Sequence, residues 1–213
     1  MLRAFVHRLP ERLLAVYRGE NIFYHIAAVV LTYVLVVSGF DWYFFEVTRS
    51  PYYYPLIMAA GIGGFFIPVL VPVGMYVAGE IRKSASLATS AALCAQAVII
   101  AWAISSFYKV FTGRIQPDFL LQSSGIDGSR DFNFGFLQHG IFWGWPSSHT
   151  ATACALAAAL IVCYSDNKLV KGLALLLAVS VSAGAAVGFH WFSDVLAGII
   201  IGTLAGVVVA RAK

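Results

Sequence analysis

Two histidines and one aspartate are the residues whose types and spacing best suit catalysis in this sequence. His149 closes the segment Pro146-Ser147-Ser148-His149, and His190 stands four residues before Asp194. A helix that begins near residue 190 would place His190 and Asp194 on one face, where the carboxylate can fix the tautomer of the imidazole. Taken alone, each motif has another explanation: a structural pair near a membrane interface, and a polar residue at a helix start.

A basic segment and a helix start supply candidate partners for an anion. Lys109-Val-Phe-Thr-Gly-Arg114-Ile-Gln116-Pro117 precedes the first histidine motif. A helix that opens after Pro146, capped by Ser147, presents free backbone N–H groups and the positive end of its dipole. Lys109 and Arg114 taken alone are equally explained as anchors to lipid headgroups. The combined set suits attack on phosphorus, because it offers a nucleophile, a proton donor and cations for the equatorial oxygens.

A zinc site built from His149, His190 and Asp194 is the rival use of the same side chains. We rank it lower, because Lys109 and Arg114 would repel a cation placed among them. The three cysteines each lie inside an apolar run, which argues against a disulfide framework or a thiolate metal cluster. We therefore expect no metal and no other cofactor.

Six apolar stretches are long enough to cross a bilayer core, which takes roughly 20 residues per helix. They cover residues 22–40, 55–79, 86–108, 147–165, 169–189 and 193–210. The fold class that this predicts is an all-α polytopic membrane protein, a bundle of six transmembrane helices. Residues 1–20 alternate arginines with apolar residues, so we expect an interfacial amphipathic segment ahead of a membrane domain over 21–213.

The distribution of lysine and arginine predicts that both termini are cytoplasmic. Ten of these residues fall on one side of the predicted spans: Arg3, Arg8, Arg12, Arg18, Arg82, Lys83, Lys168, Lys171, Arg211 and Lys213. Four fall on the other: Arg49, Lys109, Arg114 and Arg130. The connections 41–54, 109–146 and 190–193 then face outward, so the three segments suited to chemistry meet on the outer face of the membrane.

The composition excludes several classes of protein. Hydrophobic residues make up 60% of the chain and charged residues 11%, with a mean hydropathy of +0.82. Soluble domains run nearer one-quarter charged. A soluble globular enzyme, a disordered chain and a nucleic-acid-binding protein are therefore excluded, and the expected partners are the bilayer and a membrane lipid. The sequence leaves the oligomeric state open.

At these motifs the sequence resembles the type-2 phosphatidic acid phosphatase superfamily of integral membrane lipid phosphatases, which also includes vanadium haloperoxidases. The family carries three motifs. The first is a lysine, often followed by Gly-Arg, and then Arg-Pro; the second is Pro-Ser-Gly-His. The third is Ser-Arg followed after five residues by a histidine and after three more by an aspartate. The matching segments here are Lys109 to Pro117, Pro146 to His149, and His190 to Asp194. With the six spans, the resemblance covers the chain from about residue 22 onward.

The resemblance implies a lipid phosphatase that works in two steps without a metal. His190 would attack phosphorus to give a phosphohistidine, Asp194 would hold its ring, and His149 would protonate the departing alkoxide and then activate water. Phosphate oxygens would be bound by Lys109, the Ser147 hydroxyl and the Ser148 backbone N–H. The expected substrate is a phospholipid or isoprenoid carrier, and the expected location is a bacterial inner membrane with the site facing the periplasm.

The sequence departs from the family at three positions. The arginine before the proline is Gln116, which offers a neutral donor, the arginine six residues before His190 is Gly184, and Ser148 replaces a glycine. Three hypotheses follow. Arg114 or Arg130 supplies the missing charge; or the substrate carries less charge at the reacting phosphorus, for example a phosphodiester or diphosphate lipid, with transfer of a headgroup or phosphoryl group; or the protein is a catalytically silent lipid-binding member. A transporter is disfavoured, because the charges lie at span ends.

Overall fold

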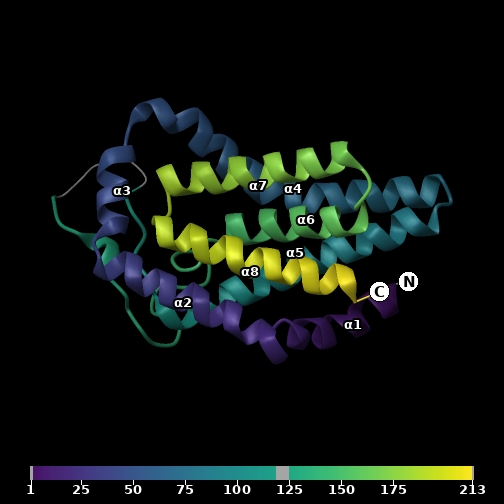
Figure 1. Cartoon of the computed structure of the whole chain (residues 1–213), viewed down its shortest axis with the longest axis horizontal. Helices are drawn as coiled ribbons and strands as arrows, with labels where there is room; N and C mark the ends of the chain where they lie inside the picture. The colour runs from purple at the N-terminus through teal and green to yellow at the C-terminus, as the bar shows by residue number, and fades with distance from the viewer. Residues whose placement is uncertain (1, 119–124, 213) are drawn as a thin grey trace.

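The computed structural model describes residues 2–118 and 125–212, and within them it is built from helices without a β-strand (Figure 1). The α-helices are α1 (Leu2–Ala15), α2 (Ile22–Val37), α3 (Phe40–Thr48), α4 (Tyr54–Ile81), α5 (Ala85–Thr112), α6 (Ser148–Cys163), α7 (Lys168–Gly188) and α8 (Phe192–Arg211). Short 3-10 turns cover Gly19–Asn21, Pro51–Tyr53 and Gly128–Arg130. The all-α class predicted from the sequence is confirmed.

Five segments of the described chain are long and apolar enough to cross a membrane: Gly19–Val37, Pro51–Ile81, Ala85–Thr112, Lys168–Gly188 and Phe192–Arg211. The remaining apolar helix, α6, has 16 residues, or about 24 Å of helix against a hydrocarbon core of about 30 Å. Ten of its residues are buried, so α6 faces other helices more than lipid. The chain is thus an all-α polytopic membrane protein, and the sixth crossing stays a prediction.

Two helices end a few residues away from the predicted boundaries, and a glycine explains each end. The stretch 22–40 ends as a helix at Val37, because Gly39 adopts a left-handed φ of 75° and redirects the chain into α3. Figure 1 shows α3 running across one end of the bundle. The stretch 86–108 continues to Thr112, where Gly113 at a φ of 48° stops α5. Lys109 therefore lies in the last helical turn and not in a loop.

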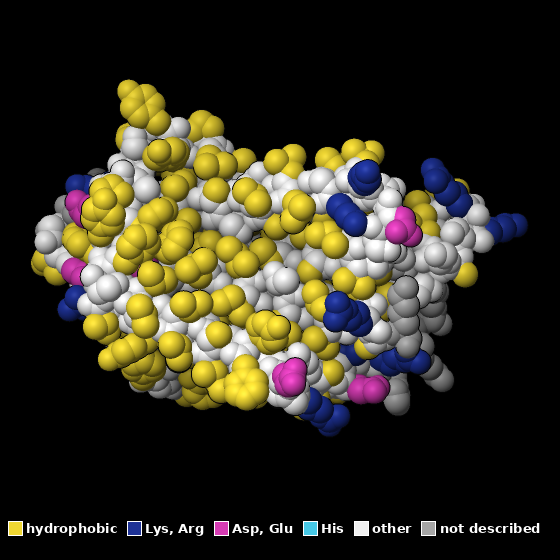
Figure 2. Space-filling view, in the orientation of Figure 1, with side chains coloured by type: hydrophobic (Ala, Val, Ile, Leu, Met, Phe, Trp, Pro, Cys, Tyr) yellow, Lys and Arg dark blue, Asp and Glu magenta, His cyan; other side chains and the backbone are white. Residues whose placement is uncertain are grey.

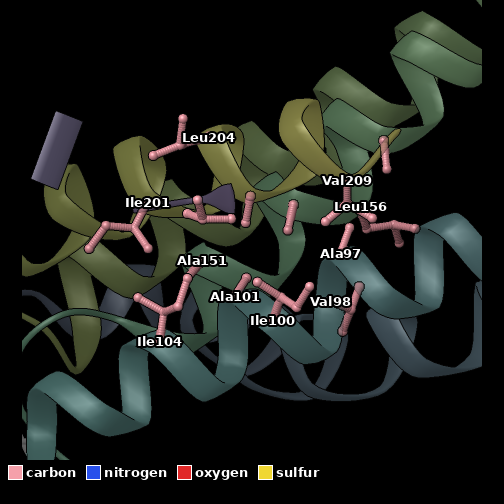
Figure 3. Close-up of a cluster of buried hydrophobic side chains, with 14 of the residues drawn as sticks. Ala97, Val98, Ile100, Ala101, Ile104, Ala151, Leu156, Ile201, Leu204 and Val209 are labelled. Atoms are coloured by element: carbon pink, nitrogen blue, oxygen red, sulfur yellow. The ribbon is translucent and has the colours of Figure 1, made fainter. Parts of the chain in front are cut away.

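Close backbone contact between α6 and α8 fixes the centre of the bundle. A Cβ at Gly198 would lie 2.7 Å from the Ser147 carbonyl oxygen, and one at Gly202 would lie 2.2 Å from that of Ala151. Small residues allow such an approach between membrane helices. Around this contact α5, α6 and α8 share an apolar core (Figure 3). The start of α8 is consequently held against the start of α6.

The two termini lie at the same end of the molecule (Figure 1). There the buried Arg12 of α1 donates hydrogen bonds to Gln96 of α5 and, at 2.6 Å, to the carbonyl of Ala212. Lysine and arginine side chains gather at this end in Figure 2, although Lys213 and the Arg3 side chain lie outside the described residues. The arrangement suits an even number of crossings. An interfacial location for residues 1–20 stays a prediction.

Candidate active site

The end of the bundle opposite the termini brings the sequence motifs together (Figure 1). The last turn of α5, the start of α6 and the junction between α7 and α8 meet there. The rings of His149 and His190 both contact Phe189, with centroids 5.1 and 5.4 Å from its ring. Lys109 is close enough for its charge to act on both histidines. The structure therefore gathers the two histidines and the lysine in one place.

The start of α6 is capped by Ser147, as the sequence indicates. The Ser147 hydroxyl oxygen accepts the Thr150 backbone N–H at 3.4 Å, and the Ser147 backbone N–H donates to the Asp194 carbonyl at 3.0 Å. The cap uses the oxygen of Ser147 and leaves its O–H as a donor. Ser148, which replaces the family's glycine, hydrogen-bonds through its hydroxyl to Ser105 on α5 at 2.9 Å.

His190 and Asp194 pair at a helix start, not along one helix as expected. The helix α8 begins only at Phe192, and Asp194 in its first turn turns back toward the preceding residues. Its Oδ2 accepts the Trp191 backbone N–H at 3.3 Å and lies 3.1 Å from Nδ1 of His190. With the proton on Nδ1, the Nε2 lone pair is available as a nucleophile.

The environment of His190 favours its neutral form. Burial lowers the pKa of His190 below its ordinary value, and the hydrogen bond to Asp194 opposes that effect without overcoming it. The charges of Lys109 and Arg114 lower the pKa further. Because an unperturbed imidazole has a pKa near 6.5, the ring is uncharged at pH 7 and can act as a nucleophile.

Arg114 is fully buried and binds protein groups with all of its donors. Nη1 donates to Asp194 Oδ1 at 2.5 Å and to Ser193 Oγ at 2.8 Å. Nη2 donates to Asp41 Oδ2 and to the Ser129 carbonyl, both at 2.7 Å, and Nε donates to the same carbonyl at 3.2 Å. A guanidinium has five N–H groups. These bonds use them all, so Arg114 holds the aspartates and has no donor left for a phosphate.

Asp41 on α3 is the site residue that sequence reasoning missed. It is fully buried. Its Oδ1 accepts the Ser193 backbone N–H at 2.9 Å, and its Oδ2 accepts the Ser193 hydroxyl at 2.5 Å as well as Arg114. A signal was present, because an acidic residue directly after an apolar span is costly in a membrane protein and marks a function by default.

Lys109 is a buried ammonium without a carboxylate partner in the described part of the chain. The residue is only 1% exposed, and its Nζ donates a hydrogen bond to the Phe142 carbonyl at 3.0 Å. An ammonium has three N–H donors. In the described part of the chain no carboxylate lies within ion-pair distance of this group. A buried charge requires a partner, and a phosphate oxygen at the start of α6 would provide one.

The positions of the two missing arginines differ in character. Gln116 is half-buried, and its Oε1 is a buried atom without a hydrogen-bond partner. Gly184 packs directly on α4, where a Cβ would lie 2.4 Å from the Ala60 Cβ and 2.5 Å from the Leu56 carbonyl oxygen. No larger side chain fits there unless α4 moves.

Arg130 does not reach the described site. Its side chain is 59% exposed, and its Nε lies 3.4 Å from a carboxylate oxygen of Asp127 on the same turn. His, Cys, Asp and Glu side chains of residues 2–118 and 125–212 form no group of three that could hold a metal ion. The geometry thus offers the zinc alternative no support.

The fold and the site define an integral membrane protein with a buried His–Asp pair, a second histidine and a lysine at one end of a helical bundle. The family model of the PAP2 superfamily matches residues 87–213, more than half of the chain. The chain therefore belongs to the PAP2 superfamily, as its motifs indicate. Neither the curated proteins nor the solved structures contain a match. Asp41 lies outside the matched region.

Proposed function

We propose that this protein is a membrane lipid phosphatase that acts through a phosphohistidine at His190. It hydrolyses a phosphate monoester or a diphosphate of a phospholipid or isoprenoid carrier. The observation that carries the proposal is the buried His190, bound through Nδ1 to Asp194 at 3.1 Å, beside the buried Lys109. Membership of a superfamily of phosphatases supports the same reaction.

In the first step Nε2 of His190 attacks phosphorus, and the bond from phosphorus to the lipid oxygen breaks. His149 donates a proton to the departing alkoxide. Lys109, the Ser147 hydroxyl and the Ser148 backbone N–H bind the other phosphate oxygens, with the helix start of α6 adding a positive field. Asp194 stabilises the positive charge that develops on the imidazole.

In the second step water hydrolyses the phosphohistidine. His149, now neutral, accepts a proton from the water as its oxygen attacks phosphorus. The nitrogen–phosphorus bond breaks, phosphate leaves, and His190 regains its lone pair. The scheme uses side chains of this protein alone and needs no cofactor.

The proposed location is a bacterial inner membrane, with both termini in the cytoplasm and the site facing the periplasm. The gathering of basic side chains at the end that carries the termini supports this orientation (Figure 2). The substrate lipid would then reach the site from the outer leaflet.

A second candidate is transfer of a lipid headgroup or phosphoryl group. The neutral Gln116 and the tightly packed Gly184 favour it, because each replaces a family guanidinium. Fewer cations suit a phosphodiester, which carries one negative charge, better than a dianionic monoester. A catalytically silent lipid-binding role is the third reading of the same substitutions.

The test is phosphate release by the purified protein in detergent. Phosphatidic acid, phosphatidylglycerophosphate, undecaprenyl diphosphate and lipid A form the panel, with His190→Ala as the inactive variant. The half-buried His139 lies outside the His–Asp pair, so His139→Ala is the matched control. Release by wild type and His139→Ala, and not by His190→Ala, is the expected result. Equal release by all three proteins refutes the mechanism, and headgroup exchange without phosphate release favours the second candidate.

A further inference from the structure

A row of buried ionic groups connects α3 to the nucleophile. Asp41 contacts Arg114 at 2.7 Å, Arg114 contacts Asp194 at 2.5 Å, and Asp194 lies 3.1 Å from His190. Both aspartates and the arginine are fully buried. The row joins residues far apart in the sequence, and Asp41 at its end comes from a part of the chain that precedes the PAP2 match.

Asp41 also fixes the first turn of α8. It accepts both the backbone N–H and the hydroxyl of Ser193, the residue before Asp194. A carboxylate held at two points by one residue, and by Arg114 at a third, has little freedom to move. The position of Asp194 is therefore defined from two sides: by Arg114 directly and by Ser193 through the backbone.

The charges along the row do not cancel. Two carboxylates share one guanidinium, which leaves the row with one net negative charge to set against the Lys109 ammonium that also acts on His190. The other charged or titratable groups facing His190 are Lys109 and His149. In a buried site with a low effective dielectric, a charge that is left over acts strongly on its neighbours. If Asp41 were neutral, Arg114 would be paired with Asp194 alone and would weaken the hold of that carboxylate on the imidazole.

We propose that Asp41 is a positioning residue for His190. It holds Arg114 and Ser193 so that Asp194 Oδ2 stays on the imidazole. It also takes up part of the Arg114 charge, which leaves Asp194 able to stabilise the positive charge that forms on His190 when Nε2 bonds to phosphorus. This role rests on the proposed phosphohistidine mechanism, and its test separates the two.

The decisive comparison is Asp41→Asn against Glu46→Gln. Glu46 lies on the same helix and pairs with the half-buried Arg49, outside the buried row, so its neutralisation leaves that row intact. We expect Asp41→Asn to lower kcat by about tenfold or more, since a residue that orients a catalytic histidine acts on the transition state. KM should stay within about twofold. Loss of the negative charge also moves the acid limb of the pH profile of kcat/KM to lower pH.

A second variant separates charge from packing. Ser193→Ala removes a hydrogen-bond partner of Asp41 and keeps every charge in the row, so we expect a smaller loss of kcat and an unmoved acid limb. All variants are assayed at a temperature where circular dichroism and gel filtration show them folded. An Asp41→Asn protein with the wild-type rate, or with a lower rate and an unmoved acid limb, overturns the proposal.

Titration of the histidines by NMR tests the role of Asp41 independently of any phosphatase activity. A wild-type protein that releases no phosphate refutes the phosphatase and leaves the row of charges to be tested directly. With labelled histidine, the His190 signal should titrate at lower pH in Asp41→Asn than in wild type and Glu46→Gln. Identical titration of His190 in all three proteins overturns the role of Asp41.

Discussion

Replacing Arg114 with methionine should destabilise the protein far more than the same change at Arg130. Methionine is apolar and of similar length, so Arg114→Met removes the charge and the five hydrogen bonds while largely filling the space. Asp41 and Asp194 would then face each other as buried carboxylates without a cation. At Arg130 the side chain is 59% exposed and pairs only with the neighbouring Asp127 at 3.4 Å.

The expected magnitudes follow from burial. Removing one partner of a buried ion pair costs about 3–5 kcal/mol. Since about 1.4 kcal/mol is a factor of ten, the folding equilibrium constant of Arg114→Met should fall more than about a hundredfold. The guanidinium also lies 4.8 Å from the centroid of the Phe132 ring, which adds about 1 kcal/mol. An exposed pair such as that of Arg130 contributes about 0–1 kcal/mol.

The assay is reversible unfolding in mixed micelles of mild detergent and dodecyl sulfate, followed by circular dichroism, together with titration of the folded proteins with vanadate as a phosphate analogue. Arg130→Met should unfold at the wild-type midpoint and bind vanadate as wild type does. Arg114→Met should unfold much earlier. An Arg114→Met protein of wild-type stability whose vanadate affinity has collapsed would show that this guanidinium binds phosphate directly, against the hydrogen bonding described above.

Three further outcomes are expected. Gly184→Ala should lower the free energy of unfolding by about 1–3 kcal/mol, because the added methyl overlaps α4. Gly172→Ala on the same helix meets open space and should leave the free energy of unfolding unreduced. Equal unfolding midpoints for the two variants would contradict this packing. The pKa of His190 is lowered, and the neutral ring is the reactive form. The value of kcat/KM should therefore stay level as pH falls to about 6.5 and decline only below that pH. A decline that begins above pH 7 would contradict the pKa shift. Lys109→Met should weaken vanadate binding at least about tenfold, since the Lys109 ammonium is a buried cation of the described site without a carboxylate partner. An unchanged vanadate affinity would show that Lys109 does not bind the phosphate.

The motifs themselves were readable from the sequence because they depend on near neighbours. The four-residue spacing of His190 and Asp194 predicted their pairing, which is confirmed at 3.1 Å. The spacing did not reveal the geometry of this contact. Helix α8 begins later than expected, so the two side chains meet across the start of the helix and not along one of its faces. In the same way, hydropathy located the spans, but the left-handed glycines at 39 and 113 decided where two of them end.

The sequence by itself determined the membrane class and the superfamily motifs, and it predicted that a histidine beside a basic group acts as a nucleophile. The tertiary structure decided which groups each charged side chain binds. Arg114 looked like a phosphate ligand, yet its five donors are used by Asp194, Ser193, Ser129 and Asp41. The Asp41 contact spans 73 residues and that with Asp194 spans 80. A buried guanidinium binds whichever acceptors the fold packs around it, and sequence spacing describes only the neighbours within a few helical turns.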